Sequence, residues 1–322
     1  MFQFHRLAAL SLLTLQGAWS AVAAQAQPTL TFSPAGPQQS APHGQGNVYA
    51  PEILRIDGQL HLWFGGQGAD GHDRIQLATS DDGVAWVQQG IAFDDPNANH
   101  CNDPTIVTTP QGYFMYYTRA VAGVTDCIAL ATSPDAKRWT LHGPIFYPGA
   151  ANEWDALSVG RPAALYVDGV FHLWYDGRRD LPLGAPDATA PQSATSQRAI
   201  GYATSSDGIR WGRCPSNPVL RDDYGGVDVF QTPAGYGMVV ESRDGVYAAT
   251  SRNGRDWKKM GLLVAKQPTD AERHGHVTPF VLTESGDGGA TLFYGGAAAA
   301  SWDRNAIYRL PLVDNLWNRF RD

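Results

Sequence analysis

Basic clusters, cysteines and long apolar runs are all scarce in this sequence. The formal net charge is -7 at pH 7 and no concentrated basic stretch occurs, whereas binding to nucleic-acid phosphates needs a concentrated basic face. We therefore expect no nucleic-acid partner. Beyond the N-terminal segment, no apolar run approaches the roughly 20 residues that cross a bilayer. We therefore expect no membrane span in the mature chain.

Only three cysteines are present, Cys101, Cys127 and Cys214. An odd number leaves at least one thiol without a partner inside the chain. Cys101 and Cys127 fall within one repeat of the sequence, and whether they form a disulfide stays open. The cysteine spacing matches no zinc motif.

The N-terminal segment has the composition of an export signal. Arg6 is followed by an apolar run over residues 7–22 and by small residues up to Ala26. This order of basic, apolar and small residues predicts a signal peptide over residues 1–26 and a periplasmic or secreted location. A membrane anchor is the alternative, but Gln16 interrupts the run, which is short for a bilayer.

Two repeated patterns organise the rest of the chain. The first is a small-residue strand, a polar turn and a tryptophan, as in ATSDDGVAW, and its four copies begin at Ala78, Ala131, Ala203 and Ala249. The second is a hairpin in which aromatic and aliphatic residues alternate, and its five copies begin at Pro51, Pro104, Pro162, Asp228 and Pro279. The alternation is typical of strands with two differently packed faces.

Repeats of this kind predict an all-β fold. We expect residues 27–322 to form one domain, a five-bladed β-propeller. The 35 Gly and 21 Pro suit many short strands joined by tight turns. A β-sandwich would not explain why the same turn and tryptophan recur with each hairpin. The last sheet would be completed by a strand from Ala306 or by an N-terminal strand from Leu30. We expect a monomer.

In a propeller the first strand of each sheet lines a central channel. The hairpin starts therefore bring together residues that are distant in sequence: Glu52, Asp103, Arg161, Asp228, and His274 and His276 just ahead of the fifth strand. Burying several carboxylates around one axis is costly unless they are paired, hydrogen-bonded or used in chemistry. The channel is therefore the predicted site.

Three segments resemble a known group of enzymes. NVYAPEILRIDGQLHLWF, residues 47–64, is similar to the "WAPE/WAPD" strand of glycoside hydrolase family 43. HCNDPTIV, residues 100–107, resembles the "DP" strands of that family and of its five-bladed relatives, families 32, 68, 117 and 130, and RHGHVTPFVL, residues 273–282, is similar to their fifth-blade "GHG" segment. The resemblance implies the propeller architecture and activity on a carbohydrate.

The resemblance also implies three acidic residues: a base or nucleophile, a proton donor, and a third that adjusts the donor's pKa. Asp103 matches the "DP" pattern. Asp228 lies where the families imply a Glu acid, Ala50 occupies the expected first acidic position, and Glu52 follows Pro51 instead of preceding a proline. The predicted catalytic residues are Asp103, Asp228, Glu52 and the loop residue Asp155. Each acid could instead cap a turn or form a salt bridge with Arg161, Arg178 or Arg273.

Four further residues are predicted to bind substrate. Arg161 could hold a sugar hydroxyl or a carboxylate with its planar donors, and Trp154 could stack on a sugar ring. Glu241 is a further acid in the fourth hairpin. The resemblance implies that His276 helps to hold a cation such as Ca²⁺, or water, in the channel, or acts as an acid. No cofactor is required.

The favoured function is a glycoside hydrolase acting on a glycan, with a furanoside or pentose-containing polysaccharide as one option. A non-catalytic carbohydrate-binding propeller is the first alternative, since the acid pattern departs from that of the families. A transglycosylase or phosphorylase is the second. Phosphorolysis needs basic residues at the channel, for which Arg161 and Arg273 are the candidates.

Overall fold

The computed structural model describes residues 28–32, 47–68, 71–122, 124–185, 189–283, 289–299 and 304–312. The predicted signal peptide lies outside these ranges. Within them every regular element is a β-strand, from β1 to β22. None of the described ranges contains a helix that could cross a membrane.

Five four-stranded antiparallel sheets, here blades I to V, account for most of these strands. Blade I contains β2 (Val48–Ile56), β3 (Gln59–Gln67), β4 (Asp73–Ser80) and β5 (Val87–Phe93), and blade II contains β6 (His100–Thr109), β7 (Gly112–Val121), β8 (Val124–Ser133) and β9 (Thr140–Phe146). Blade III contains β10 (Ser158–Val167), β11 (Val170–Arg178), β14 (Ala199–Ser205) and β15 (Gly212–Arg213). Blade IV contains β16 (Gly225–Thr232), β17 (Gly235–Ser242), β18 (Gly245–Ser251) and β19 (Lys258–Ala265). Blade V contains β20 (His276–Thr283), β21 (Ala290–Ala297), β22 (Asn305–Leu312) and β1 (Thr29–Phe32), while β12 (Leu181–Pro182) and β13 (Gln192–Ser193) form a separate parallel pair.

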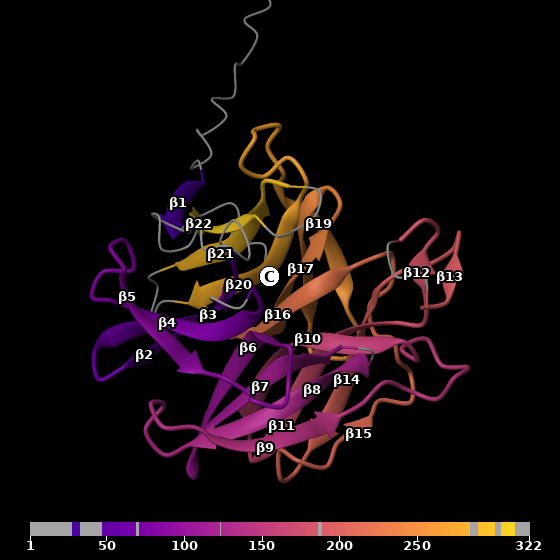
Figure 1. The fold of residues 1–322 in the computed structure, drawn as a ribbon, viewed down its shortest axis with the longest axis horizontal. Helices are drawn as coiled ribbons and strands as arrows, with labels where there is room; N and C mark the ends of the chain where they lie inside the picture. Colours follow the sequence, from indigo (N-terminus) through magenta and orange to yellow (C-terminus); the bar gives the residue numbers. More distant parts are fainter. Residues whose placement is uncertain are drawn as a thin grey trace, which may run out of the picture.

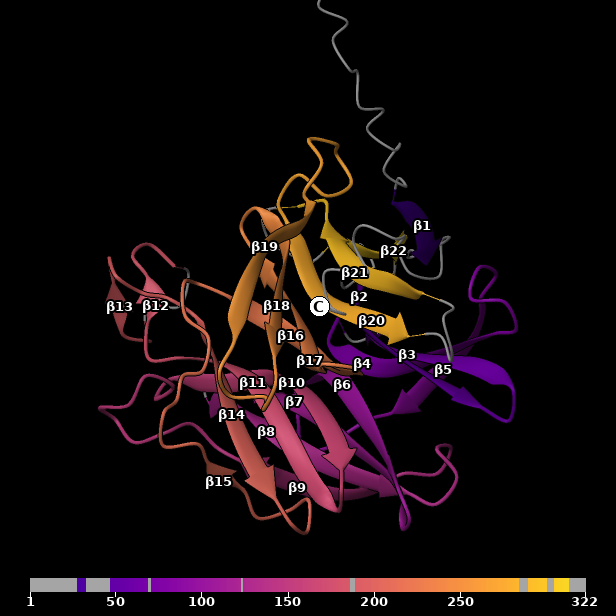
Figure 2. The same cartoon turned by 180° about the vertical axis from the view of Figure 1, so that it is seen from behind.

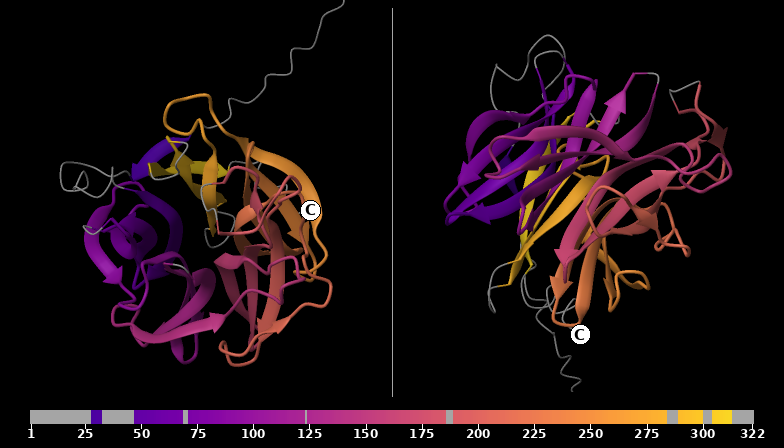
Figure 3. Two further views of the ribbon diagram at one scale, coloured as in Figure 1. Left: turned by 45° about the vertical axis from the view of Figure 1, so that its right-hand side comes forward. Right: turned by 90° about the horizontal axis from the view of Figure 1, so that it is seen from below.

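The blades follow one another around a common axis in chain order (Figure 1, and from behind in Figure 2). Each innermost strand contacts the innermost strands of both neighbouring blades, so β2, β6, β10, β16 and β20 form a closed ring. The ring is visible as a sequence of colours in the left view of Figure 3. The predicted five-bladed β-propeller is confirmed.

Blade V closes the ring with strands from both ends of the described chain. β1 pairs antiparallel with β22, which pairs with β21. The two strands that the sequence offered as alternatives therefore both belong to this sheet. Joining the first strand to the last blade holds the ring shut and leaves fewer free sheet edges.

The repeated ATS segment forms the same turn in each copy. In blade I, Ser80 Oγ accepts a hydrogen bond from Gly83 N at 2.9 Å, and Asp82 Oδ1 accepts from Val84 N and Ala85 N at 2.8 and 2.9 Å. Blade III repeats the set with Ser205 and Asp207. The short polar side chains thus satisfy the backbone donors of a turn that has no helix or ladder to do so.

The tryptophan that follows each turn packs towards the preceding blade. Five apolar clusters fill the five interfaces between successive blades, and Trp86, Trp139, Trp211 and Trp257 each contact the cluster shared with the blade before their own. The fifth cluster joins blades IV and V. This packing explains why the turn and the tryptophan recur together in the sequence.

The three cysteines are free. Cys101 on β6 and Cys127 on β8 both pair across to Arg119 on β7, so one whole strand separates them. Two strand spacings amount to roughly 9.5 Å, which exceeds the reach of a disulfide, about 7 Å between Cα atoms. The disulfide left open by the sequence therefore does not form in this fold.

Candidate active site

All five innermost strands carry a β-bulge at the same position. The pairing between each innermost strand and its neighbour shifts by one residue there. The bulged residues have positive φ and are Ala50 (52°), Asp103 (49°), Arg161 (44°), Gly226 (35°) and Thr278 (40°). A bulge changes the direction of a side chain, so each blade places a different residue at this level of the channel.

Proline follows the bulged residue in four blades, and Val227 follows Gly226 in blade IV. A bulge leaves an unpaired residue in the ladder, and proline has no N–H to leave unsatisfied. The Asp-Pro dipeptide at Asp103 is therefore one form of a structural element that the other blades build with Ala-Pro, Arg-Pro and Thr-Pro.

In blades III, IV and V the N–H of the bulged residue bonds to a side chain of the preceding blade. Thr118 Oγ1 accepts from Arg161 N at 2.7 Å, Asp176 Oδ2 accepts from Gly226 N at 3.3 Å, and Glu241 Oε2 accepts from Thr278 N at 2.8 Å. These three acceptors occupy equivalent places, each paired with the residue just before its own blade's bulge. Glu241, predicted as a substrate ligand, thus joins blade IV to blade V.

Two buried carboxylates and two guanidinium groups form an ion cluster between blades III and IV. Asp176 Oδ2 accepts from Arg161 Nη1 at 2.6 Å and lies 3.7 Å from Arg198 Nη1, which also bonds to Glu241. Burial raises the pKa of Glu241, but Arg198 and Arg161 outweigh it and hold the pKa below its ordinary value. Glu241 is therefore a paired, ionised group.

Blade IV has glycine both at its bulge and just before it, whereas blade III has glycine only just before its bulge, at Gly160. A Cβ at Gly225 would meet the Arg198 guanidinium and Asp176 Oδ2, and one at Gly226 would meet the Glu241 carboxylate. The glycines therefore leave room for the ion cluster. The same two residues remove any acidic side chain from the bulge of blade IV.

Asp103 is the acid that this arrangement leaves available. It is 6% exposed, and its Oδ1 has no hydrogen-bond partner among the described residues. Burial raises the pKa of Asp103 to about 7, against the opposing effects of Arg161 and of a hydrogen bond from Thr118, while the charges of Glu241 and Asp73 raise it further. A carboxyl group with this pKa can exchange a proton near neutral pH.

Asp103 lines a cavity of about 290 Å³ at the end of the channel where the innermost strands begin. Arg161 and Asp176 also line this cavity, and its remaining polar wall comes from blades I and II. Tyr49 Oη donates to Asp73 Oδ2 at 2.8 Å and accepts from Asn102 Nδ2 at 2.5 Å. His100 and Asp126 lie on the same wall.

Several of these wall residues were missed by sequence reasoning. Tyr49 and Asn102 immediately precede bulged residues, so the repeat alignment could have marked them. Asp73 and Asp126 lie on the third strands of their blades, and Arg198 precedes a third strand. No feature of the sequence indicates that these third strands reach the cavity.

Glu52 and Asp228 lie further along the channel, two residues beyond the bulges. Glu52 Oε1 accepts from Ile106 N at 2.9 Å, and Asp228 Oδ2 accepts from Val281 N at 2.8 Å. Thr105 takes the equivalent place in blade II and accepts from Ala164 N at 3.2 Å. All three join their blade to the next one through a backbone N–H.

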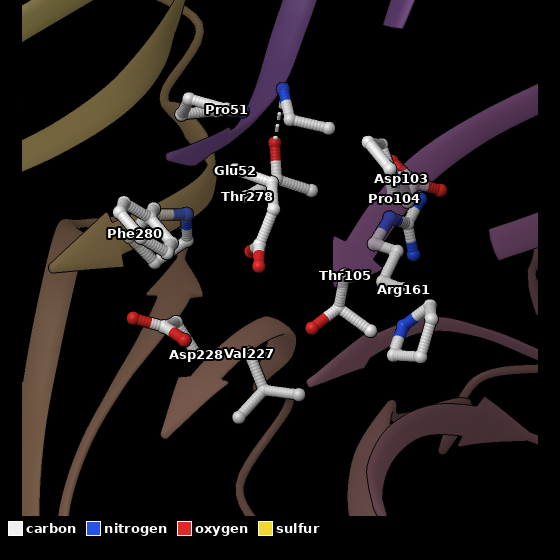
Figure 4. Close-up of a pocket in the computed structure, with 13 residues that line it drawn as sticks. Pro51, Glu52, Asp103, Pro104, Thr105, Arg161, Val227, Asp228, Thr278 and Phe280 are labelled. Atoms are coloured by element: carbon white, nitrogen blue, oxygen red, sulfur yellow. Dashed lines mark hydrogen bonds between the residues drawn. The ribbon is translucent and has the colours of Figure 1, made fainter. Parts of the chain in front are cut away.

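Figure 4 shows Glu52, Asp228 and Thr105 around a space of about 20 Å³ between the two ends of the channel. Burial and the charge of Asp228 raise the pKa of Glu52 well above its ordinary value, and burial raises that of Asp228 to about 7. Both residues line a second cavity of about 450 Å³ at the far end. Glu52 and Asp228 do not line the 290 Å³ cavity, but they share the small space of Figure 4 with Asp103 and Arg161. Their catalytic roles stay predictions.

Asp155 and Trp154 lie away from the channel cavities. Asp155 is fully buried and accepts from Tyr175 Oη at 3.0 Å and from Arg213 Nε at 3.3 Å. Trp154 stacks on Tyr175, with ring centroids 5.7 Å apart. These contacts hold the loop between β9 and β10 against blade III. Neither residue lines the channel cavities, and their catalytic and sugar-stacking roles stay predictions.

His276 is packed between blade elements and does not line any of the three channel cavities. Its Nε2 lies 2.6 Å from Glu272 Oε2, its ring lies 4.1 Å from that of Tyr294, and it is 1% exposed. No group of three or more potential metal ligands occurs among the residues that the structure describes. This environment does not fit a channel cation held by His276, and calcium binding stays a prediction.

Comparisons with known proteins agree with the fold. No protein-family profile matches the chain. A curated 1,2-beta-oligomannan phosphorylase from Thermoanaerobacter sp. (strain X514) is 31% identical over 141 residues, which cover 42% of this chain and 45% of that protein. The match thus spans less than half of that relative.

Solved structures match over most of the chain. A family 117 glycoside hydrolase from Zobellia galactanivorans has a TM-score of 0.65 and 17% identity, and covers 89% of this chain and 90% of its own. A family 130 structure, described as targeting β-1,2 mannosidic linkages in Candida mannan, has a TM-score of 0.62 and 15% identity over 89% and 94%. A thermostable family 43 glycoside hydrolase has a TM-score of 0.60 and 15% identity over 84% and 90%. The chain therefore shares the fold of the five-bladed propeller enzymes that it resembles in sequence.

Proposed function

We propose that this protein is a glycoside hydrolase that cleaves a glycan in the Asp103 cavity, with Asp103 giving its proton to the leaving oxygen. One observation carries the proposal: Asp103 lines a 290 Å³ cavity, and its buried Oδ1 has no hydrogen-bond partner among the described residues. Glycosidic cleavage needs such a donor because the departing alkoxide is a poor leaving group until it is protonated.

The surroundings of Asp103 suit this role. Its pKa of about 7 leaves the carboxyl group protonated in part of the molecules at neutral pH, which is the condition for an acid that works there. Arg161, partly exposed on the same wall, has donors beyond the one that binds Asp176. These donors are placed to hold hydroxyl groups of a bound sugar.

The substrate is to be found by screening. The names of two relatives mention β-1,2-linked mannosides, so β-1,2-mannobiose and 4-nitrophenyl β-D-mannopyranoside belong in the screen. Arabinofuranosides and pentose-containing polysaccharides test the sequence-based option of a furanoside or pentose glycan. Release of reducing sugar or nitrophenol is the readout.

The decisive variant is Asp103→Asn. Asn tolerates positive φ, so the bulge is kept while the proton is lost, and we expect the rate on unactivated substrates to fall by about 100-fold or more. Asp168→Asn is the matched control, because Asp168 is exposed in the blade III hairpin and also has positive φ. Equal activity of Asp103→Asn and the control would refute the assignment. Sugar binding without any turnover by the wild-type protein would instead indicate a carbohydrate-binding propeller.

Phosphorolysis is the second candidate, and Arg178 favours it. Arg178 Nε is buried without a hydrogen-bond partner among the described residues. Burial lowers the pKa of Arg178, Asp176 opposes this, and Arg198 and Arg161 lower it further. Positive charge that is not fully paired attracts a phosphate. Cleavage that requires inorganic phosphate and yields a sugar 1-phosphate would establish this activity, whereas cleavage in phosphate-free buffer supports hydrolysis.

The protein is further proposed to act outside the cytoplasm as a monomer. The support for export is the composition of residues 1–26. Cell fractionation, with N-terminal sequencing of the exported chain, tests the location and the cleavage point. Size-exclusion chromatography with light scattering tests the oligomeric state.

A further inference from the structure

The wall of the Asp103 cavity contains four carboxylate residues, and they differ in how they are bonded. Asp176 binds Arg161 and the Gly226 N–H, and Asp73 accepts from Tyr49. Asp103 has a free Oδ1. Asp126, the fourth, forms neither a hydrogen bond nor an ion pair with any residue that the structure describes. Among the described wall carboxylates, Asp126 is therefore the one without a hydrogen bond or ion pair, and Asp103 accepts a hydrogen bond from Thr118.

The register of blade II explains how Asp126 reaches the cavity from a third strand. Cys127 pairs with Arg119 and Val124 with Val121, and the register shift between these pairs leaves Thr125 and Asp126 opposite Ala120. Ala120 itself pairs with His100 on β6. Ala120 and His100 both line the cavity. The small alanine leaves the space across β7 open, so an acid on β8 faces the same volume as Asp103.

Other positions around the channel do not supply a second acid to this cavity. Ala50 and Gly226 occupy the equivalent bulges in blades I and IV. Glu52 and Asp228 are bound to backbone N–H groups nearer the far end. Hydrolysis of a glycoside normally uses two carboxyl groups, one to protonate the leaving oxygen and one to act on water or on the sugar.

We propose that Asp126 is the second catalytic residue and accepts the proton of the water that attacks the anomeric carbon. This inference rests on the proposed hydrolase activity. In the step, the water oxygen forms a bond to the anomeric carbon as the bond from that carbon to the leaving oxygen breaks. The Asp103 proton moves to the leaving oxygen, and the water proton moves to Asp126. Exchange of one proton with solvent at each residue restores the starting state.

The two environments divide the roles between the residues. Asp103 is buried, which disfavours its charged form and suits an acid. Asp126 is exposed, so water reaches it. Desolvation nevertheless raises the pKa of Asp126, Arg161 and His100 oppose this, and Asp176 raises it further; Arg161 also lowers the pKa of Asp103. Arg161 thus lies in reach of both.

The test compares Asp126→Asn, Asp103→Asn and the control Asp168→Asn on phenyl and 2,4-dinitrophenyl glycosides of the sugar found in the screen, with and without sodium azide. We expect Asp126→Asn to lose about 100-fold or more on both leaving groups, and azide, which needs no base, to restore the rate with a glycosyl azide as product. Asp103→Asn should lose activity on the phenyl glycoside and keep most of it on the dinitrophenyl glycoside, which needs no acid. Loss of the base is thus rescued by azide, and loss of the acid is rescued by a better leaving group.

The outcomes separate this inference from the proposed function. If Asp126→Asn keeps the wild-type rate while Asp103→Asn does not, Asp126 is not the base and the hydrolase survives. A folded Asp126→Asn variant that is inactive and not rescued by azide also overturns the inference. Full activity of that variant with inorganic phosphate, yielding a sugar 1-phosphate, would show that no water-activating base is needed. Absence of cleavage by the wild-type protein on every substrate overturns both proposals.

Discussion

Replacing Asp103 by Asn should make the protein more stable at neutral and higher pH while it removes activity. The carboxyl group has an ordinary pKa of 3.8 and a pKa of about 7 in the fold. Between these values the unfolded chain gives up its proton while the folded protein keeps it. Because the unfolded state is then favoured as the pH rises, the contribution of Asp103 to stability is complete below 3.8 and is lost as the pH passes through 7.

The size of the effect follows from the same two values. Each pH unit between them costs about 1.36 kcal/mol of unfolding free energy. From pH 5 to pH 8 the wild-type protein should therefore lose about 3 kcal/mol through Asp103 alone. The amide of Asn does not titrate and keeps the bulge at positive φ, so the variant escapes this loss.

The assay is urea unfolding of the two proteins at pH 5, 6.5 and 8. Glu52, Asp228 and all other titrating groups are common to both proteins and cancel in the difference between their unfolding free energies. This difference should move in favour of Asp103→Asn by about 3 kcal/mol over the range. A difference that does not change with pH, or that moves in favour of the wild type, would refute the claim that Asp103 is an acid held neutral by burial.

Four other predictions follow from the site and its supports. Cleavage of unactivated substrates should fall as the pH rises through about 7, because Asp103 then loses the proton it donates, and a pH profile of kcat that stays flat to pH 9 would contradict this. Glu52→Ala should lower the unfolding free energy by about 1–3 kcal/mol by leaving the Ile106 N–H buried and unpaired. Glu52→Gln keeps the acceptor and should retain stability and activity. A Glu52→Gln variant that is stable but inactive would instead support a catalytic role for Glu52. Gly225→Ala should displace Arg198 and Asp176 and lower both stability and activity. The control Gly212→Ala should change neither, because its added Cβ meets nothing closer than 3.8 Å. In a thiol titration one group, Cys214, should react in the native protein and three after denaturation, because Cys101 and Cys127 are buried; fewer than three after denaturation without reductant would indicate a disulfide.

The blades were predictable because their determinants are local and repeated. The Ser and the Asp or Asn of each ATS turn satisfy that turn's own backbone, and the tryptophan beside it fills an interface that recurs around the ring. The closing strand could not be decided, since β1 and β22 both have strand-like sequences. Only the closed ring shows that blade V uses both.

The site was only partly predictable from the sequence, because it depends on which side chains contact the neighbouring blade. Asp103 follows from the Asp-Pro motif and the channel geometry. Asp126 does not, because its access depends on the small Ala120 between it and β6. The backbone partners of Glu52 and Asp228 lie on the next blade, and no spacing within one repeat reveals them.

A raised pKa does not by itself identify the acid of this channel. Burial raises the pKa of Asp103 and of Asp228 to about 7 in both cases. Asp228, however, accepts a hydrogen bond from the Val281 N–H. At the equivalent position of blade II, Thr105 accepts the same kind of hydrogen bond without carrying a charge. Because a hydroxyl group takes this position in blade II, we infer that the Asp228 carboxyl group serves as a hydrogen-bond acceptor in blade IV. Asp103 Oδ1, in contrast, has no hydrogen-bond partner among the described residues, and we therefore expect the proton of Asp103 to be the one available to a substrate.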